Sequence, residues 1–202
     1  MTYWKTLIFS AFVLLSFWKQ ETGVTVGDIA PDFSLRNVDG KMLGLKSNSD
    51  AKGYIIVFTC NTCPYSEMYE DRLIALHQKY AILGYPVLAI QPNNPQASVG
   101  DSFAKMKERA NTKEFPFAYV IDSDGQETTS AYGATNTPQV YVLNKEGNSF
   151  KVAYIGAIDN NSRNPASATK RYVESAVDAL INSQTVEIPV TKAIGCIIRW
   201  AE

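Results

Sequence analysis

The chain has 202 residues, enough for one domain with a sizeable core but short for two. With 46% hydrophobic residues, 19% charged residues and a net charge of -1, its composition is that of a globular protein and excludes disordered and fibrous classes. Because Lys and Arg are scattered and not in excess, the sequence offers no electrostatic basis for nucleic-acid binding.

The N-terminus differs from the rest of the chain. Leu7 to Trp18 form an uncharged apolar run, which is short against the about 20 residues that cross a bilayer but fits the about 7 to 15 of a secretory signal. No A-x-A cleavage pattern precedes Lys19, so an uncleaved membrane tether stays open, as does a buried N-terminal helix. We expect residues 1–22 to be a signal peptide or tether and residues 23–202 to be one exported domain, periplasmic or tethered facing the periplasm.

Short apolar runs follow, with helix-like stretches between them. Asp39-Gly40, between two apolar segments, is typical of a β-hairpin turn. Continuous apolar runs predict strands that are buried on both faces of a sheet. These runs are Tyr54–Phe58, Pro86–Ile90, Phe117–Ile121 and Gln139–Leu143. A turn sequence joins the last run to Lys151–Gly156, so the sheet should end antiparallel and be mixed.

Helical periodicity places the other elements. Apolar residues recur at steps of three and four after Cys63 and stop at Gly84, which predicts a long helix. Strand, cysteine turn, helix and strand form a β-α-β crossover, which sets the first two apolar strands parallel. Further helices are predicted over Asp101–Ala110 and Ala166–Ile181, with a loop over Gln91–Gly100. The sequence indicates an α/β fold, a central mixed sheet flanked by helices with an N-terminal β-hairpin.

Cys60 and Cys63 form a C-x-x-C pair where a predicted strand ends and a predicted helix begins. A thiolate attacks a disulfide, and the amides and dipole at a helix start lower a cysteine pKa, so we expect Cys60 to be a nucleophile with a lowered pKa. Cys63 is then placed to resolve the mixed disulfide that Cys60 forms. Pro64 suits the first helical turn, where a missing N–H matters little. The simplest pairing is a Cys60–Cys63 disulfide.

Other roles for these cysteines stay open. A zinc site needs about four ligands, and the chain adds only Cys196 and the single His77 to the pair, so we expect no metal. A purely structural disulfide over so short a loop would remove little chain entropy. Cys196, in GCIIRW, is expected to be a buried inert thiol; as an accessory thiol with a regulatory or resolving role it would require the tail to fold back to the active site.

Three segments resemble the thioredoxin-like superfamily, in its branch of exported redoxins related to the alkyl hydroperoxide reductase and thiol-specific antioxidant group. They are APDFSL followed by DGK, FTCNTCPY, and NTPQVYVLN. The resemblance covers Val24 to Ile181 and implies a thioredoxin-like fold in which Cys60 is the nucleophile and Cys63 the resolving thiol.

The same resemblance implies a substrate site. It predicts that the Thr137-Pro138 bond is cis and faces the cysteine pair, and that the backbone before this proline pairs with an extended substrate. The implied substrate-binding residues are Asn61, Thr62, Pro64, Thr137 and Pro138. A trans proline at a strand edge is the alternative.

The sequence departs from the peroxidase pattern of that group, P-x-x-x-T-x-x-C. Counted back from Cys60, the Thr and Pro places hold Val57 and Gly53; counted back from Cys63, they hold Cys60 and Ile56. Dithiol–disulfide exchange is therefore favoured over peroxide reduction. Because the intervening dipeptide matches neither reducing nor strongly oxidising members, the direction of electron flow stays open.

We therefore expect an antioxidant-type thiol-disulfide oxidoreductase that exchanges electrons between Cys60-Cys63 and protein or small-thiol disulfides, with an unidentified electron donor and no cofactor beyond its redox-active disulfide. A peroxiredoxin-like thiol peroxidase using Cys60 is the alternative within enzymes. A non-catalytic binding module that keeps the thioredoxin fold, with the pair as a staple, is the alternative from another class.

Overall fold

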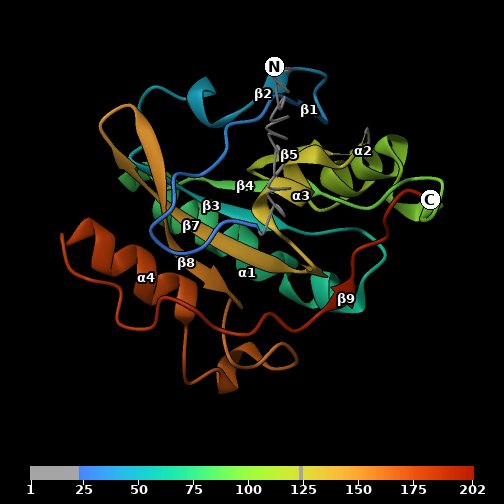
Figure 1. The fold of residues 1–202 in the computed structure, drawn as a ribbon. Helices are drawn as coiled ribbons and strands as arrows, with labels where there is room; N and C mark the ends of the chain where they lie inside the picture. Colours follow the sequence, from blue (N-terminus) through green and yellow to red (C-terminus); the bar gives the residue numbers. More distant parts are fainter. Residues whose placement is uncertain (1–22, 123–124) are drawn as a thin grey trace, which may run out of the picture.

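The computed structural model describes residues 23–122 and 125–202, so the predicted signal or tether segment lies outside the described residues. The main sheet has seven strands in the order β2-β1-β5-β4-β3-β7-β8, and β6 and β9 form a separate two-stranded sheet (Figure 1). The strands are β1 (Leu35–Asn37), β2 (Met42–Leu43), β3 (Gly53–Phe58), β4 (Val87–Gln91), β5 (Ala118–Ile121), β6 (Asn136–Thr137), β7 (Gln139–Glu146), β8 (Ser149–Gly156) and β9 (Cys196–Ile197). The helices are α1 (Pro64–Tyr80), α2 (Phe103–Thr112), α3 (Glu127–Tyr132) and α4 (Tyr172–Ile181). In this part of the chain no helix combines the length and the apolar character that spanning a membrane requires.

The main sheet is mixed, as the sequence predicts. Strands β3, β4 and β5 are parallel neighbours, whereas β7 runs antiparallel to β3 and β8 antiparallel to β7. The predicted hairpin at Asp39-Gly40 is the β1–β2 pair, with Gly40 at a φ of 91°, which favours glycine, and it extends the sheet beyond β5. The α/β class and the N-terminal hairpin are therefore confirmed.

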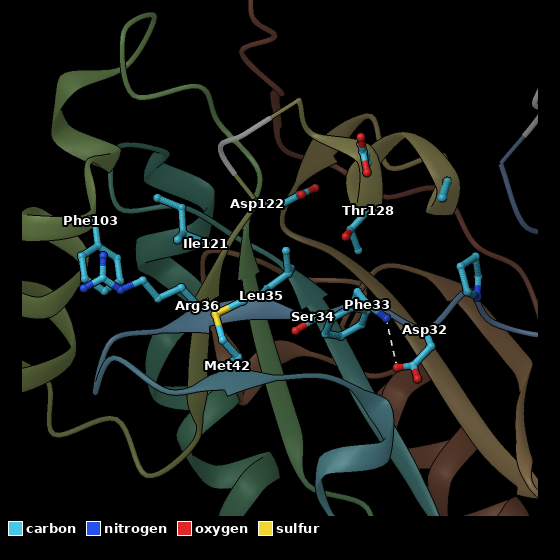
Figure 2. A pocket seen from close by; sticks show the side chains of 13 residues that line it. Asp32, Phe33, Ser34, Leu35, Arg36, Met42, Phe103, Ile121, Asp122 and Thr128 are labelled. Atoms are coloured by element: carbon cyan, nitrogen blue, oxygen red, sulfur yellow. Dashed lines mark hydrogen bonds between the residues drawn. The ribbon is translucent and has the colours of Figure 1, made fainter.

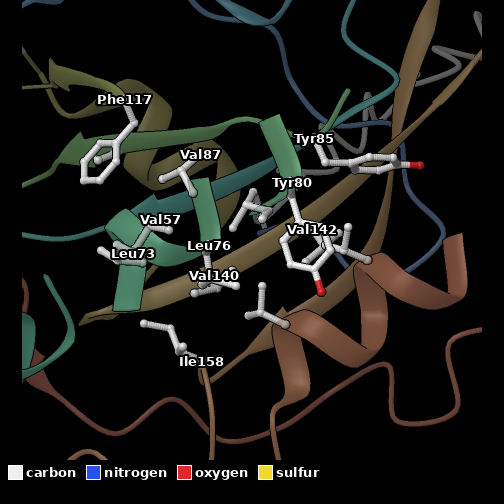
Figure 3. Packing of buried hydrophobic residues seen from close by; sticks show 14 of the residues in the cluster. Val57, Leu73, Leu76, Tyr80, Tyr85, Val87, Phe117, Val140, Val142 and Ile158 are labelled. Atoms are coloured by element: carbon white, nitrogen blue, oxygen red, sulfur yellow. The ribbon is translucent and has the colours of Figure 1, made fainter. Parts of the chain in front are cut away.

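The central strands bury both faces. Along β3, Ile55 and Val57 face one apolar cluster while Ile56 and Phe58 face the other, which is the two-residue alternation of a strand. Helices α1, α2 and α4 cover the first face, where Tyr80 of α1 packs with Val142 of the sheet (Figure 3). The N-terminal segment, α3 and the C-terminal tail cover the second face. The turn after β3 is thereby held between a rigid sheet and a well-packed helix.

Helix boundaries differ from prediction mainly at α4. Prediction places its start at Ala166, but the helix begins at Tyr172. The Asn164 side chain accepts a hydrogen bond from the Ala166 amide and caps the start of a short 3-10 turn over Pro165–Ser167, which is separate from the helix. The backbone amide of Asn160 donates to the carbonyl of Lys170 at 3.1 Å, and this hydrogen bond closes the loop just before the helix begins.

Helix α3 is absent from the sequence-based prediction. Its sequence ETTSAY is rich in residues of modest helix propensity, and only Tyr132 gives it a large apolar group. A buried carboxylate supplies the missing support, because Asp122 accepts hydrogen bonds of 2.7 Å and 2.6 Å from the amide and hydroxyl of Thr129. Tertiary contacts thus form a helix that local periodicity does not indicate.

Candidate functional site

The cysteine turn joins β3, which ends at Phe58, to α1, which begins at Pro64. Cys63 occupies the N-cap position of α1 and Pro64 the first helical position, as the missing N–H of proline allows. Cys60 lies in the turn before the cap and is not itself at the helix terminus. The helix-start position expected for Cys60 therefore belongs to Cys63.

The cysteine pairing differs from the expected one. Cys63 forms a disulfide with Cys196, with their Cα atoms 5.9 Å apart, while Cys60 is a buried free thiol. The expected Cys60–Cys63 bridge and the expected inert Cys196 are therefore both wrong for this structure. The reason is that the C-terminal tail folds back, so that β9 pairs antiparallel with β6 and Cys196 lies opposite Thr137.

Thr137 contacts both cysteines of the C-x-x-C pair. Its hydroxyl lies 3.2 Å from the sulfur of Cys60, and its carbonyl oxygen lies 3.1 Å from the sulfur of Cys63. The Thr137-Pro138 peptide bond is cis, which confirms that prediction. The structure therefore brings five predicted residues together at one place: Cys60, Cys63, Thr137, Pro138 and Cys196.

Asp101 is a central member of the site that the sequence reading misses. Its fully buried side chain accepts hydrogen bonds of 2.7 Å and 3.1 Å from the amides of Asn61 and Thr62, and one of 2.7 Å from the Thr62 hydroxyl. Ser98 and Asn93 donate to the same carboxylate at 2.6 Å and 2.8 Å. The local pattern gives Asp101 only as the start of a helix, because the contacts that matter are some forty residues distant in sequence.

The environment of Cys60 opposes ionisation. Burial raises the pKa of its thiol, and the charge of Asp101 raises it further. The hydroxyl of Thr137 and the backbone amides of Cys63 and Thr62 act in the opposite direction but do not prevail. The expected lowering of the Cys60 pKa is therefore wrong, because burial and the charge of Asp101 outweigh the hydrogen bonds that favour the thiolate.

The remaining predicted site residues surround this turn. The Asn61 amide donates to the carbonyl of Gly100 at 3.0 Å and accepts from the Tyr119 hydroxyl at 3.0 Å, so Asn61 braces the turn from inside. Thr62 and Pro64 are exposed beside the cysteines. His77, considered above as a zinc ligand, instead lies on α1 with its ring 6.0 Å from that of Phe117, where burial lowers its pKa.

A hollow of about 660 Å³ lies elsewhere, between the N-terminal hairpin and α3. Figure 2 shows Arg36 and Met42 of the hairpin on one side and Asp122 and Thr128 on the other. None of the three cysteines lines it. The reactive sulfurs therefore lie apart from this hollow.

Comparison with known proteins gives a family match and named relatives. The model of the AhpC/TSA family matches residues 26–151, which include Cys60, Cys63, Thr137 and Pro138 but not Cys196. The thiol-disulfide oxidoreductase ResA of Geobacillus thermodenitrificans is 29% identical over 143 residues, 69% of this chain and 75% of that protein.

Solved structures share the fold. An uncharacterized conserved protein from Geobacillus kaustophilus is 31% identical, with a TM-score of 0.80 over 88% of this chain and 93% of that one. A putative thiol:disulfide interchange protein DsbE from Chlorobium tepidum, 22% identical, gives a TM-score of 0.61 over 79% of this chain and 99% of that one. These likenesses confirm the thioredoxin-like fold.

Proposed function

The chain belongs to the AhpC/TSA family, and we propose that it is a thiol-disulfide oxidoreductase that uses three cysteines in sequence. The observation that carries this proposal is the state of the site: Cys63 is bonded to Cys196 while Cys60 stays a thiol, and both cysteines of the pair contact Thr137. The relatives named thiol-disulfide oxidoreductase support the same chemistry.

The first part of the cycle is a dithiol–disulfide exchange. The Cys60 thiolate attacks one sulfur of an outside disulfide, which forms a mixed disulfide and releases the other half as a thiolate. Cys63 attacks the Cys60 sulfur of that mixed disulfide, so a Cys60–Cys63 bond forms and the second half leaves. Two electrons and two protons pass from the protein dithiol to the substrate, which becomes two thiols.

The second part moves the disulfide inside the protein. The Cys196 thiolate attacks Cys63, a Cys63–Cys196 bond forms, and Cys60 leaves as a thiolate that takes up a proton. No electrons are gained or lost in this step. Its product is the arrangement seen in the structure, in which Cys60 is again a thiol. Two outside thiols, or one dithiol, then reduce the Cys63–Cys196 bridge to two thiols and are themselves oxidised to a disulfide.

The positions of other residues support further roles. Thr137 holds both sulfurs and Pro138 follows it in the cis bond, which suits them to contact the substrate cysteine. Thr62 and Pro64 are exposed next to the pair and would contact the body of a substrate. Asn61, by contrast, would act on the turn and not on the substrate.

We place this chemistry in an exported protein that needs no cofactor besides its cysteines. A persistent disulfide suits an oxidising compartment, and the apolar run Leu7 to Trp18 suits export or a membrane tether facing the periplasm. The partners are protein or small-molecule thiols and disulfides, one of which is the electron donor.

A peroxidase role is the second candidate, and one contact favours it. The Thr137 hydroxyl, 3.2 Å from the Cys60 sulfur, supplies from another strand the hydroxyl that the local sequence lacks. In that reaction Cys60 would take one peroxide oxygen as a sulfenic acid and release the rest as water, and Cys63 would then condense with it.

Turnover by single-cysteine variants tests these proposals. The full-length protein and its Cys60→Ser, Cys63→Ser and Cys196→Ser variants are given excess dithiothreitol and either bis(hydroxyethyl) disulfide or hydrogen peroxide. Disulfide exchange predicts loss of disulfide turnover in the first two variants and a slower but measurable rate in Cys196→Ser. Faster consumption of peroxide than of disulfide would favour the peroxidase. No turnover of either oxidant would overturn both and favour the non-catalytic module.

A further inference from the structure

We propose that the C-terminal strand is a built-in peptide ligand of the cysteine site, so that small disulfides and thiols react there while extended polypeptides are excluded until the strand leaves. This inference rests on the proposed function and names the substrate class that the site admits. It concerns Gly195, Cys196, Ile197 and Ile198, which lie outside the region that matches the family.

The tail occupies the backbone edge beside the reactive sulfurs. Strand β9 pairs antiparallel with β6, with Cys196 opposite Thr137 and Ile197 opposite Asn136. The amide of Ile198 donates to the carbonyl of Thr135 at 3.1 Å, which continues this pairing. Since Thr137 contacts both Cys60 and Cys63, a strand on this edge delivers its cysteine to the pair, as the Cys63–Cys196 bond demonstrates.

Gly195 lies directly on the Thr137-Pro138 peptide. A Cβ atom at Gly195 would overlap the carbonyl group of Thr137 and lie 3.0 Å from the nitrogen of Pro138. A larger residue at this position would therefore push the strand off the edge. The close approach shows that the tail is fitted to the site, because only glycine lets the backbone come this near.

Contacts on both sides hold the tail without help from the disulfide. Ile198 is only 2% exposed and packs into the apolar cluster on the α3 face of the sheet. Beyond it, the Arg199 amide donates to Asn93 and the Ala201 amide donates to Gln126, each at 2.8 Å. Before it, the Thr191 hydroxyl accepts from the Ala157 amide at 2.9 Å. These contacts keep the strand over the site when the bridge is reduced.

The exposure of the three cysteines differs, and this distinguishes small thiols from extended polypeptides as substrates. Cys60 and Cys63 are 4% and 2% exposed, whereas Cys196 is partly exposed, so a small thiol can reach the bridge from the Cys196 side. An extended polypeptide that added a strand at β6 would compete with β9, which already pairs with that edge. Figure 1 shows the tail, in red, running from α4 across the molecule to this edge.

The test compares a small and a polypeptide disulfide on full-length proteins. Bis(hydroxyethyl) disulfide and insulin are each reduced with dithiothreitol as donor, and the insulin-to-small rate ratio is recorded for wild type, Ile198→Ala and Gly195→Val. Ile198→Ala removes the buried anchor, and Gly195→Val displaces the strand without touching the core. The matched control is Ile197→Ala, since that side chain is 76% exposed on the same strand.

We expect both tail variants to raise the ratio of insulin to small-disulfide reduction rates about tenfold, a difference of about 1.4 kcal/mol. Ile197→Ala should leave this ratio within about twofold. An unchanged ratio in Gly195→Val, with the small disulfide still turned over, would overturn the inference. Loss of small-disulfide turnover in the wild-type protein would instead overturn the proposed function.

Discussion

The carboxylate of Asp101 accepts a 2.7 Å hydrogen bond from the backbone amide of Asn61, the residue that follows Cys60. One buried acid thereby fixes the cysteine turn and also raises the pKa of the Cys60 thiol. Burial is the larger cause of this rise and the charge of Asp101 the second. The two effects of Asp101 can be separated by substitution.

Replacement of Asp101 by Asn should lower the Cys60 pKa relative to wild type, because the negative charge is removed while an amide oxygen can still accept from Asn61. Stability should fall by about 1 to 3 kcal/mol, since the new amide group cannot accept from the donors Ser98 and Asn93. The pH dependence of Cys60 alkylation and urea unfolding measure the two effects. Ser98→Ala, which removes one donor and no charge, is the control and should leave the alkylation profile in place.

Cys60 reactivity should rise with pH well into the alkaline range. Burial disfavours the thiolate, so its pKa lies above the ordinary value, and below that pKa the thiolate fraction falls about tenfold per pH unit. The alkylation rate of Cys60 should therefore still climb at a pH where an exposed thiol, of pKa about 8.5, has reached its plateau. A plateau near neutral pH would contradict this.

Thr137→Val should raise the Cys60 pKa further, because the 3.2 Å contact from the Thr137 hydroxyl favours the thiolate. The expected result is slower Cys60 alkylation at fixed neutral pH and a profile displaced to higher pH. Thr135→Val is a suitable control, because Thr135 is exposed and does not contact a cysteine sulfur. Equal profiles for the two variants would exclude the proposed role of the hydroxyl.

Thiol counting should reveal the change of partner at Cys63. The oxidised wild-type protein has three cysteines and one bridge, so it should show one reactive thiol under denaturing conditions. Cys60→Ser should show none. Cys196→Ser should also show none after oxidation, because Cys63 then pairs with Cys60. Two remaining thiols in Cys196→Ser would mean that Cys60 and Cys63 do not bond.

The ion pair between Arg72 and Asp159 should be important for stability. It is 2.6 Å long with side chains 14% and 5% exposed, and Tyr69 also donates to Asp159. Arg72→Ala leaves a buried carboxylate without its charge partner, so unfolding free energy should fall by about 3 to 5 kcal/mol. Lys79→Ala, which breaks an ion pair whose lysine is 49% exposed, should change it by less than about 1 kcal/mol. Denaturant unfolding compares the two.

The elements whose signal lies in neighbouring residues were predictable from the sequence. Strand β3 is a continuous apolar run, helix α1 carries apolar residues at steps of three and four, and the cis bond before Pro138 followed from a matched motif. The disulfide partner of Cys63 was not predictable, because it depends on a tail that returns across a separation of 133 residues. The role of Asp101 was hidden for the same reason, since its contacts with the cysteine turn come from the amides of Asn61 and Thr62, about forty residues away in sequence.

The bridge from Cys63 to Cys196 also ties the chain end to the start of α1 and so closes most of the polypeptide into a ring. In the chain-entropy description, a ring of this size restricts the unfolded ensemble by about 5 kcal/mol. The protein should therefore resist heat and proteolysis better in oxidising surroundings, where the Cys63–Cys196 bond persists, than in reducing ones. A molecule retained among reducing thiols would be the one most readily degraded.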